Sequence, residues 1–259
     1  MPKELFLSTI IDRHYNTPAV IDCNGPSSNF YRVDIDRLHE KKRIIKLVPN
    51  EWYSFRHSTV PDYWVISNTQ FTIRSQIDQF NKWLVPVFWA SSLDPTPIDF
   101  VKERLQPDYL AYRQGGIGGD GTEAYRGCTY NNFHHDDPKT ARTIQEFLRD
   151  LSGHTDNYST GITVAHHMIA FALIMGCHPI FLSGVDLRYD EPGAVNGYAQ
   201  VRKGAELPLP TSTTWESQKD ILMRDMQILN ESANLMEREI INLNKDAWFD
   251  QFKKGDLTI

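Results

Sequence analysis

Short apolar runs alternate with amphipathic stretches along most of the chain, the pattern of strands joined by helices. The apolar runs predict strands at 19–23, 43–48, 62–67, 84–89, 179–186 and 240–243. Helices are expected at 73–83, 97–105, 138–151, from Ser159–Gly161 to about Met175, at 214–238 and at 246–254. This alternation predicts an α/β fold with a doubly wound, mostly parallel sheet, whose ligand binds at the carboxyl ends of the strands.

Three of these elements carry a more specific expectation. The run 179–186 is continuously apolar, which is typical of a central parallel strand. The helix that ends near Gly176 is apolar on nearly all sides, so we expect it to be buried. Pro86 lies inside the run 84–89 and cannot donate a ladder hydrogen bond, so that strand is expected at an edge.

The stretch 106–137 breaks the alternation, because it is rich in Gly, Asn, Asp and Tyr and has little periodicity. We interpret it as a lid-like insertion over the active-site face of a single domain spanning 1–259. Within it, Gly116–Gly121 matches the G-x-G-x-x-G dinucleotide pattern, but no helical pattern follows directly. A loop is therefore the better interpretation.

Composition narrows the class of protein. The chain has 259 residues, 41% of them hydrophobic, and a net charge of −6. This charge argues against a nucleic-acid binder. No apolar run approaches the ~20 residues of a membrane span, and no signal peptide is recognisable. Cys23, Cys128 and Cys177 are scattered, so neither a disulfide framework nor a zinc site is expected, and a cytoplasmic location fits.

A tight turn follows the first predicted strand, in the sequence Asn24-Gly25-Pro26-Ser27. Gly25 is expected to adopt a positive φ and to let a ligand approach the backbone. Converging N–H groups in such a turn form an anion-binding concavity, so we interpret the turn as the seat of a nucleotide phosphate. The alternative is an ordinary strand-to-loop turn.

Asparagines also follow two later strands, at Asn50 and Asn68. With Asn24 they supply three amides at the ends of three strands, which suits a nucleobase, a ribose or a sugar. Asp186 ends the predicted central strand, where a carboxylate can bind ribose hydroxyls, position a base or ligate magnesium. The alternative for Asp186 is a carboxylate that caps a neighbouring loop.

Histidine pairs occur at two places. His134 and His135 lie in the expected lid and are candidates for a general base. A metal site there is disfavoured, because adjacent histidines point in different directions on most backbones, and no metal site is expected elsewhere. His166 and His167 lie within the expected buried helix, so we interpret them as a core pair.

The order of these motifs resembles that of a known superfamily over roughly 19–70 and 155–245: Asn24–Ser27, Ile35–Leu38, Asn50, Asn68, Ser159–Gly161 and Leu182–Asp186. It is similar to the compact bacterial sialyltransferases of glycosyltransferase family 42. It also resembles the related 6-hydroxymethylpterin diphosphokinase-like family, called domain of unknown function 115. The resemblance implies a Rossmann-like sheet that binds a nucleotide, CMP-sialic acid in the first group and ATP in the second.

The resemblance also implies roles for single residues. Asn24, Asn50 and Asn68 match positions that contact the nucleotide or its phosphate, and Ser159, Thr160 and Gly161 match a turn at the nucleotide. Tyr198 matches a tyrosine that binds the leaving phosphate, and Arg188 or Tyr189 falls at a second such position.

One departure bears on the reaction. The sialyltransferases carry a histidine base just before the last long helix, but the corresponding stretch here, 209–216, contains no histidine. The candidates for a general base are therefore His134, His135 or Asp186. The leading hypothesis is a glycosyltransferase that moves a CMP-activated nonulosonic acid to a glycan or small-molecule acceptor without a cofactor. The alternatives are magnesium-dependent pyrophosphoryl transfer from ATP and non-catalytic nucleotide binding. The sequence leaves open whether the chain forms a homo-oligomer.

Overall fold

The computed structural model describes residues 2–5, 9–50, 59–67, 72–90, 94, 96–114, 128–129, 163–186, 223, 226–227, 229–234 and 236–259. Its strands form one nine-stranded sheet in the order β6-β5-β4-β3-β2-β1-β7-β8-β9. They are β1 Ala19–Asp22, β2 Ile45–Pro49, β3 Tyr63–Ile66, β4 Val87–Ala90, β5 Tyr109–Gln114, β6 Cys128–Thr129, β7 Ile180–Ser183, β8 Ile240–Asn242 and β9 Lys253–Lys254. All neighbours are parallel except β5 and β6, which confirms the α/β, mostly parallel sheet.

The direction in which the sheet is built reverses beside β1. From β1 the chain adds β2, β3, β4 and β5 on one side, and β7, β8 and β9 on the other. The register places Ile21 of β1 between Leu47 of β2 and Leu182 of β7. Strands β1 and β7 therefore flank a topological switch point, the place where open α/β sheets bind their ligands.

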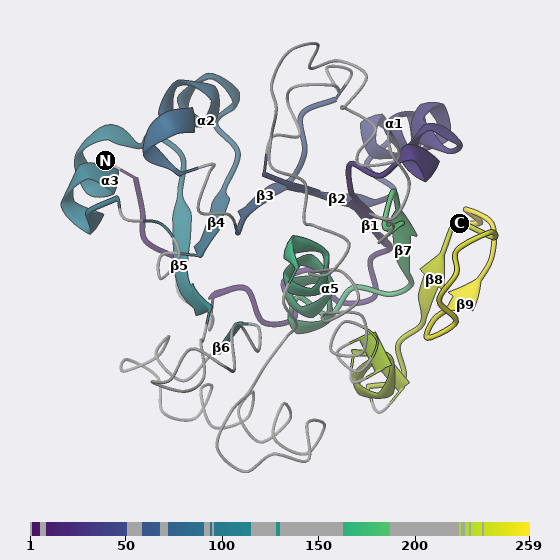
Figure 1. Cartoon of the computed structure of the whole chain (residues 1–259). Coiled ribbons are helices and arrows are strands. Elements are labelled where there is room, and N and C mark those ends of the chain that lie inside the picture. The colour runs from purple at the N-terminus through teal and green to yellow at the C-terminus, as the bar shows by residue number, and fades with distance from the viewer. Residues whose placement is uncertain are drawn as a thin grey trace, which may run out of the picture.

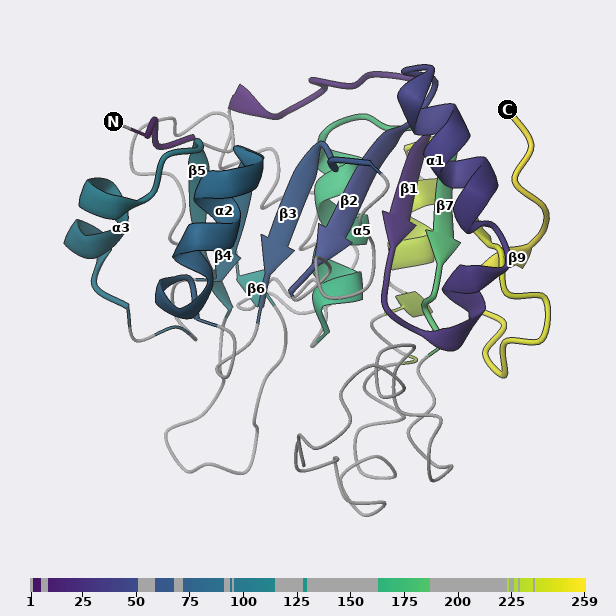
Figure 2. The same ribbon diagram turned by 90° about the horizontal axis from the view of Figure 1, so that it is seen from above.

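Helices cover both faces of the sheet (Figure 1). Helices α1 (Arg32–Glu40) and α2 (Ile77–Trp83) lie on one face, and α5 (Val164–Ile174) lies on the other (Figure 2). The short helix η4 (Arg74–Gln76) leads into α2, and α3 (Ile98–Arg104) precedes β5. Among the described residues, no helix is both long enough and apolar enough to cross a bilayer.

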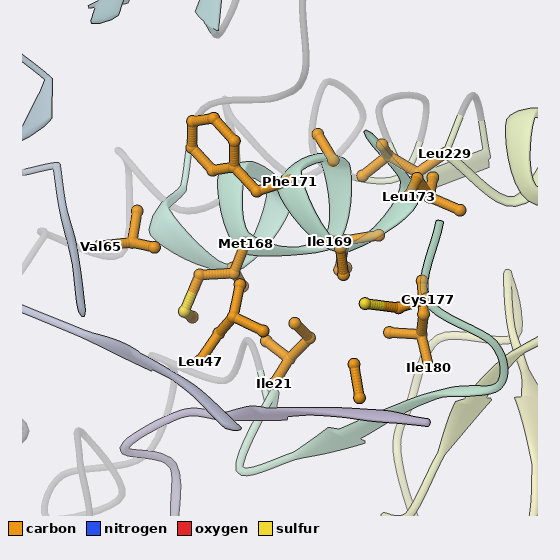
Figure 3. Packing of buried hydrophobic residues seen from close by; sticks show 14 of the residues in the cluster. Ile21, Leu47, Val65, Met168, Ile169, Phe171, Leu173, Cys177, Ile180 and Leu229 are labelled. Atoms are coloured by element: carbon orange, nitrogen blue, oxygen red, sulfur yellow. The ribbon is translucent and has the colours of Figure 1, made fainter. Parts of the chain in front are cut away.

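Helix α5 forms the centre of the core. Its residues from Ala165 to Ile174 are all buried, as the apolar pattern predicts. Met168 and Ile169 face Ile21 and Leu47 of the sheet (Figure 3). Each such side chain contributes about 1.5–3 kcal/mol through burial, so this helix anchors β1 and β2 firmly.

Both ends of α5 are fixed by local chemistry. Thr163 has an extended backbone and forms a capping box with His166, so the helix begins at Val164 rather than in 159–161. Gly176 adopts a positive φ of 74° and ends the helix, as expected. His166 and His167 are fully buried, which confirms them as core residues.

Three expectations about the elements are wrong. Strand β4 lies between β3 and β5 rather than at an edge, because Pro86 precedes its first residue and the Pro86 carbonyl still accepts from the Trp64 N–H at 3.0 Å. Part of the expected insertion, 109–114, is the parallel strand β5. The expected closing helix at 246–254 is instead an irregular segment that ends in β9. Residues 138–151 lie outside the described part.

We expect Phe171→Ala to lower the free energy of unfolding by about 3–5 kcal/mol, because the ring is buried against Phe88 and its removal leaves a cavity. The control is Val33→Ala, at a position on α1 that is 79% exposed. This change should alter the unfolding free energy by less than about 0.5 kcal/mol. Urea unfolding measures both. Equal losses in the two variants would contradict the placement of α5 in the core.

Candidate functional site

The candidate site lies at the carboxyl ends of β1 and β7. The arrows of β1, β2, β3 and β7 point the same way, so their ends share one edge of the sheet (Figure 2). The turn Asn24–Ser27 follows β1 at this edge and leads into the short helix η2 (Pro26–Asn29). Asp186 follows β7 by three residues. The fold thus brings together two motifs that are 159 residues apart in the chain.

The backbone of Gly25 is extended, with φ −67° and ψ 157°, so the expected positive φ is wrong. Glycine is needed here for space, because a Cβ would collide with the Gly184 carbonyl oxygen and with Asp186 Oδ2. A positive φ occurs instead at Gly184, directly after the neighbouring strand β7, where φ is 69°. A Cβ at Gly184 would collide with the Cys23 carbonyl oxygen. The two strand ends therefore pack backbone against backbone.

The Asp186 carboxylate bridges the turn and the last strands. Its Oδ2 accepts from the Ser27 N–H at 2.9 Å, and its Oδ1 accepts from Asn244 Nδ2 at 2.8 Å. The Asp186 carbonyl accepts from Trp248 Nε1 at 3.2 Å. This is the loop-capping arrangement that the sequence left open as the alternative for Asp186. A role in catalysis stays a prediction.

Three N–H groups in and beside the turn, those of Gly25, Ser27 and Ser28, donate within the protein. Gly25 N–H donates to the Gly184 carbonyl at 2.9 Å, and Ser28 N–H donates to the Gly25 carbonyl at 3.0 Å. Pro26 has no N–H, and Ser27 N–H donates to Asp186. A phosphate at this turn would therefore compete with the Asp186 carboxylate for the Ser27 N–H.

Uncharged polar atoms remain for a ligand at this edge. Ser27 Oγ, Ser183 Oγ, Asn24 Oδ1 and Asn242 Nδ2 are buried, and none has a hydrogen-bond partner in the described part of the chain. Ser183 and Asn242 are only 2% and 1% exposed. Buried polar groups in proteins are nearly always satisfied, so unsatisfied groups gathered at one edge indicate a place for a polar ligand.

Asn50 follows β2 as predicted, and its backbone has a positive φ of 33°. Its side-chain Oδ1 accepts from the Ser67 N–H at 3.0 Å, and its carbonyl accepts from Trp64 Nε1 at 2.6 Å. Asn50 thus joins the ends of β2 and β3. Its expected contact with a nucleotide stays a prediction. In such a contact the side-chain NH₂ of Asn50 would be the donor.

The other predicted site residues lie outside the described residues: Asn68, His134, His135, Ser159, Thr160, Gly161, Arg188, Tyr189 and Tyr198. Their roles stay predictions, as does the lid over the site. Cys23 and Cys177 are buried and free. Within the described residues, no group of three or more His, Cys, Asp or Glu is placed to hold a metal ion.

Sequence reasoning missed the contribution of the chain after β8. Asn244 and Trp248 both contact Asp186 but were not singled out. A signal was present, because Asn244 follows an apolar strand just as Asn24 and Asn50 do. The same rule of amides after strand ends would have included it.

Another polar pair lies at the opposite edge, where the strands begin. Tyr63, the first residue of β3, contacts His14 Nε2 through its hydroxyl at 2.7 Å. Burial raises the pKa of Tyr63 to about 12, so its hydroxyl keeps its proton. Burial also lowers the pKa of His14 from its ordinary value of 6.5, which favours the neutral ring.

No family model matches the chain, and no curated protein matches its sequence. Among solved structures, the chain is similar to the sialyltransferase CstII from Campylobacter jejuni, which was solved in complex with the substrate analogue CMP-3FNeuAc. The TM-score is 0.47 and the identity 15%, over 92% of this chain and 85% of that one.

We expect Gly25→Ala to lower the free energy of unfolding by about 1–3 kcal/mol, because its Cβ meets a backbone oxygen and a carboxylate. Gly255→Ala is the matched control, since its Cβ would meet only Ile241 Cγ2, at 3.0 Å. Its loss should be less than half as large. Chemical denaturation measures both, and a Gly25→Ala protein as stable as the parent would contradict the close packing of the two strand ends.

We expect stability to fall as the pH drops below about 6.5, because the unfolded chain then binds a proton that the folded His14, with its lowered pKa, resists. A histidine with a lowered pKa contributes stability that is present above its unfolded pKa and lost below it. His14→Gln should therefore flatten the pH dependence of the unfolding free energy between about pH 7 and 5. An unchanged slope would show that His14 does not contribute.

Proposed function

We propose that the chain is a glycosyltransferase that uses a nucleotide-activated sugar and holds the nucleoside part of the donor at the carboxyl ends of β1 and β7. The observation that carries this proposal is the set of polar groups at the switch point. Asn24, Ser27, Ser183 and Asp186 meet there. In open α/β sheets this is the position where ligands bind.

The chemistry of these groups favours an uncharged ligand moiety. They are an amide, two hydroxyls and one carboxylate, and the carboxylate repels phosphate but accepts from hydroxyls. Each oxygen of Asp186 accepts one hydrogen bond and can accept another. Ribose hydroxyls therefore suit Asp186 better than a phosphate does. We assign the phosphate instead to Arg188, Tyr189 and Tyr198, as the sequence resemblance implies.

The donor class comes from the sequence motifs. Their order resembles the sialyltransferases, which supports a CMP-activated nonulosonic acid. In the proposed reaction an acceptor hydroxyl forms a bond to the anomeric carbon while the bond from that carbon to the CMP oxygen breaks. A general base takes the hydroxyl proton, and CMP leaves with the electron pair. Because Asp186 is assigned to the ribose hydroxyls, we assign the base to His134 or His135.

The test is calorimetric titration of the protein with cytidine, CMP, ATP and inorganic phosphate. We expect cytidine and CMP to bind and inorganic phosphate not to displace cytidine. Asp186→Asn should weaken cytidine and CMP alike, by about tenfold, because a charge-assisted acceptor for hydroxyls is lost. If Asp186 lay beside the phosphate, removing its charge would tighten CMP relative to cytidine.

Asp62→Asn is the matched control. The Asp62 carboxylate also caps a backbone N–H, that of Lys46 at 2.8 Å, but before β3 at the opposite edge. The control substitution should leave both affinities unchanged. Turnover of a CMP-activated nonulosonate with release of CMP completes the test. Binding of ATP that falls more than about tenfold in EDTA would favour the pyrophosphoryl transfer reaction instead, and binding of no nucleotide would contradict the proposal.

A further inference from the structure

We infer that Asn244 is a positioning residue: it holds the Asp186 carboxylate against the turn after β1, so that nucleoside affinity depends on a residue in the loop after β8. The inference rests on the proposed function. It deepens that function by naming what fixes the acceptor group of the site.

Hydrogen bonds connect three strand ends in series. Asn244 N–H donates to Asn242 Oδ1 at 3.0 Å, which ties Asn244 to the end of β8. Asn244 Nδ2 donates to Asp186 Oδ1 at 2.8 Å, beyond the end of β7. Asp186 Oδ2 in turn accepts from Ser27 N–H at 2.9 Å, in the turn after β1. The series crosses the switch point from one half of the sheet to the other.

The amide of Asn244 is itself oriented. Its Oδ1 accepts from the Asp246 N–H at 3.1 Å, so the NH₂ group is the end of the amide that faces Asp186. Trp248 in the same loop donates to the Asp186 carbonyl at 3.2 Å. The loop therefore holds Asp186 at two points, one on the backbone and one on the carboxylate.

Two opposed donors fix the rotation of the carboxylate. With Asn244 and Ser27 donating to different oxygens, the carboxylate plane has one orientation, and its remaining acceptor sites point in fixed directions. Without Asn244 the terminal torsion is broad, so a bound hydroxyl group must also order the carboxylate. The cost appears in nucleoside affinity rather than in whether the chain folds.

Asn244→Ala tests this, and Asn81→Ala is the matched control. The Asn81 side chain likewise donates one hydrogen bond and accepts one, donating to the Arg104 carbonyl at 2.9 Å and accepting from Gln106 N–H at 2.8 Å. It lies on α2, away from the carboxyl ends of β1 and β7 (Figure 2). We expect similar losses of thermal stability from both. Cytidine and CMP should bind about tenfold more weakly to Asn244→Ala but within about twofold of the parent to Asn81→Ala.

A double-mutant cycle separates positioning from general loosening of the fold. If Asn244 acts through Asp186, adding Asn244→Ala to Asp186→Ala should weaken cytidine no further. The same addition of Asn81→Ala should change nothing in either background. Additive losses in the Asp186→Ala, Asn244→Ala double variant would overturn the inference.

Amide exchange keeps the inference testable if the proposed function fails. Asn244→Ala should raise the exchange rate of the Ser27 amide by about tenfold or more, because its acceptor is no longer held. Asn81→Ala should leave that rate unchanged. If the parent protein binds no nucleotide, the proposed function is wrong, but the exchange rate still tests whether Asn244 positions Asp186. An unchanged Ser27 exchange rate in Asn244→Ala would overturn the positioning role.

Discussion

The close approach of the backbones of Gly25 and Gly184 is the constraint on which the candidate site depends. The Gly25 N–H and the Gly184 carbonyl form a hydrogen bond of 2.9 Å, and a Cβ at either glycine would collide with the other strand end. Because no side chain separates them, the turn after β1 lies directly beside the residues after β7. Only then can the Asp186 carboxylate reach the Ser27 N–H. The protein's own packing therefore requires glycine at both positions, whether or not a ligand binds.

The rest of the fold holds these two strand ends at the same level. Asp22 pairs with Ser183 in the register of β1 and β7, so the last residues of both strands stand side by side. Helix α5 is buried over β1 and β2 and packs there through Met168 and Ile169 (Figure 3). A site on such a support needs little reorganisation when a ligand binds, because the polar groups are set by strands rather than by free loops.

The sequence predicts β1, β2, β3, β4, β7 and β8 well because each is a short apolar run that is largely buried. It fails where apolar spacing has another cause. Phe249 and Phe252 are three residues apart, as on a helix, yet they enter the core from turns. Strand β5 is polar in its second half and was merged with the glycine-rich stretch that follows it. In both cases a contact distant in sequence decides the structure, and local periodicity does not record it.

For the site, the rule that polar residues follow strand ends correctly places Asn24, Asn50 and Asp186 at one edge of the sheet. It cannot say which acceptor a given N–H group takes, because the carboxylate that bonds to Ser27 comes from 159 residues away. That bond changes the chemistry of the turn, because the Ser27 N–H already donates to a carboxylate of the protein. A nucleotide that binds here must present its neutral part to the sheet. Under the proposed function the charge of its phosphate then has to be neutralised elsewhere, by segments of the chain other than the one that holds the nucleoside.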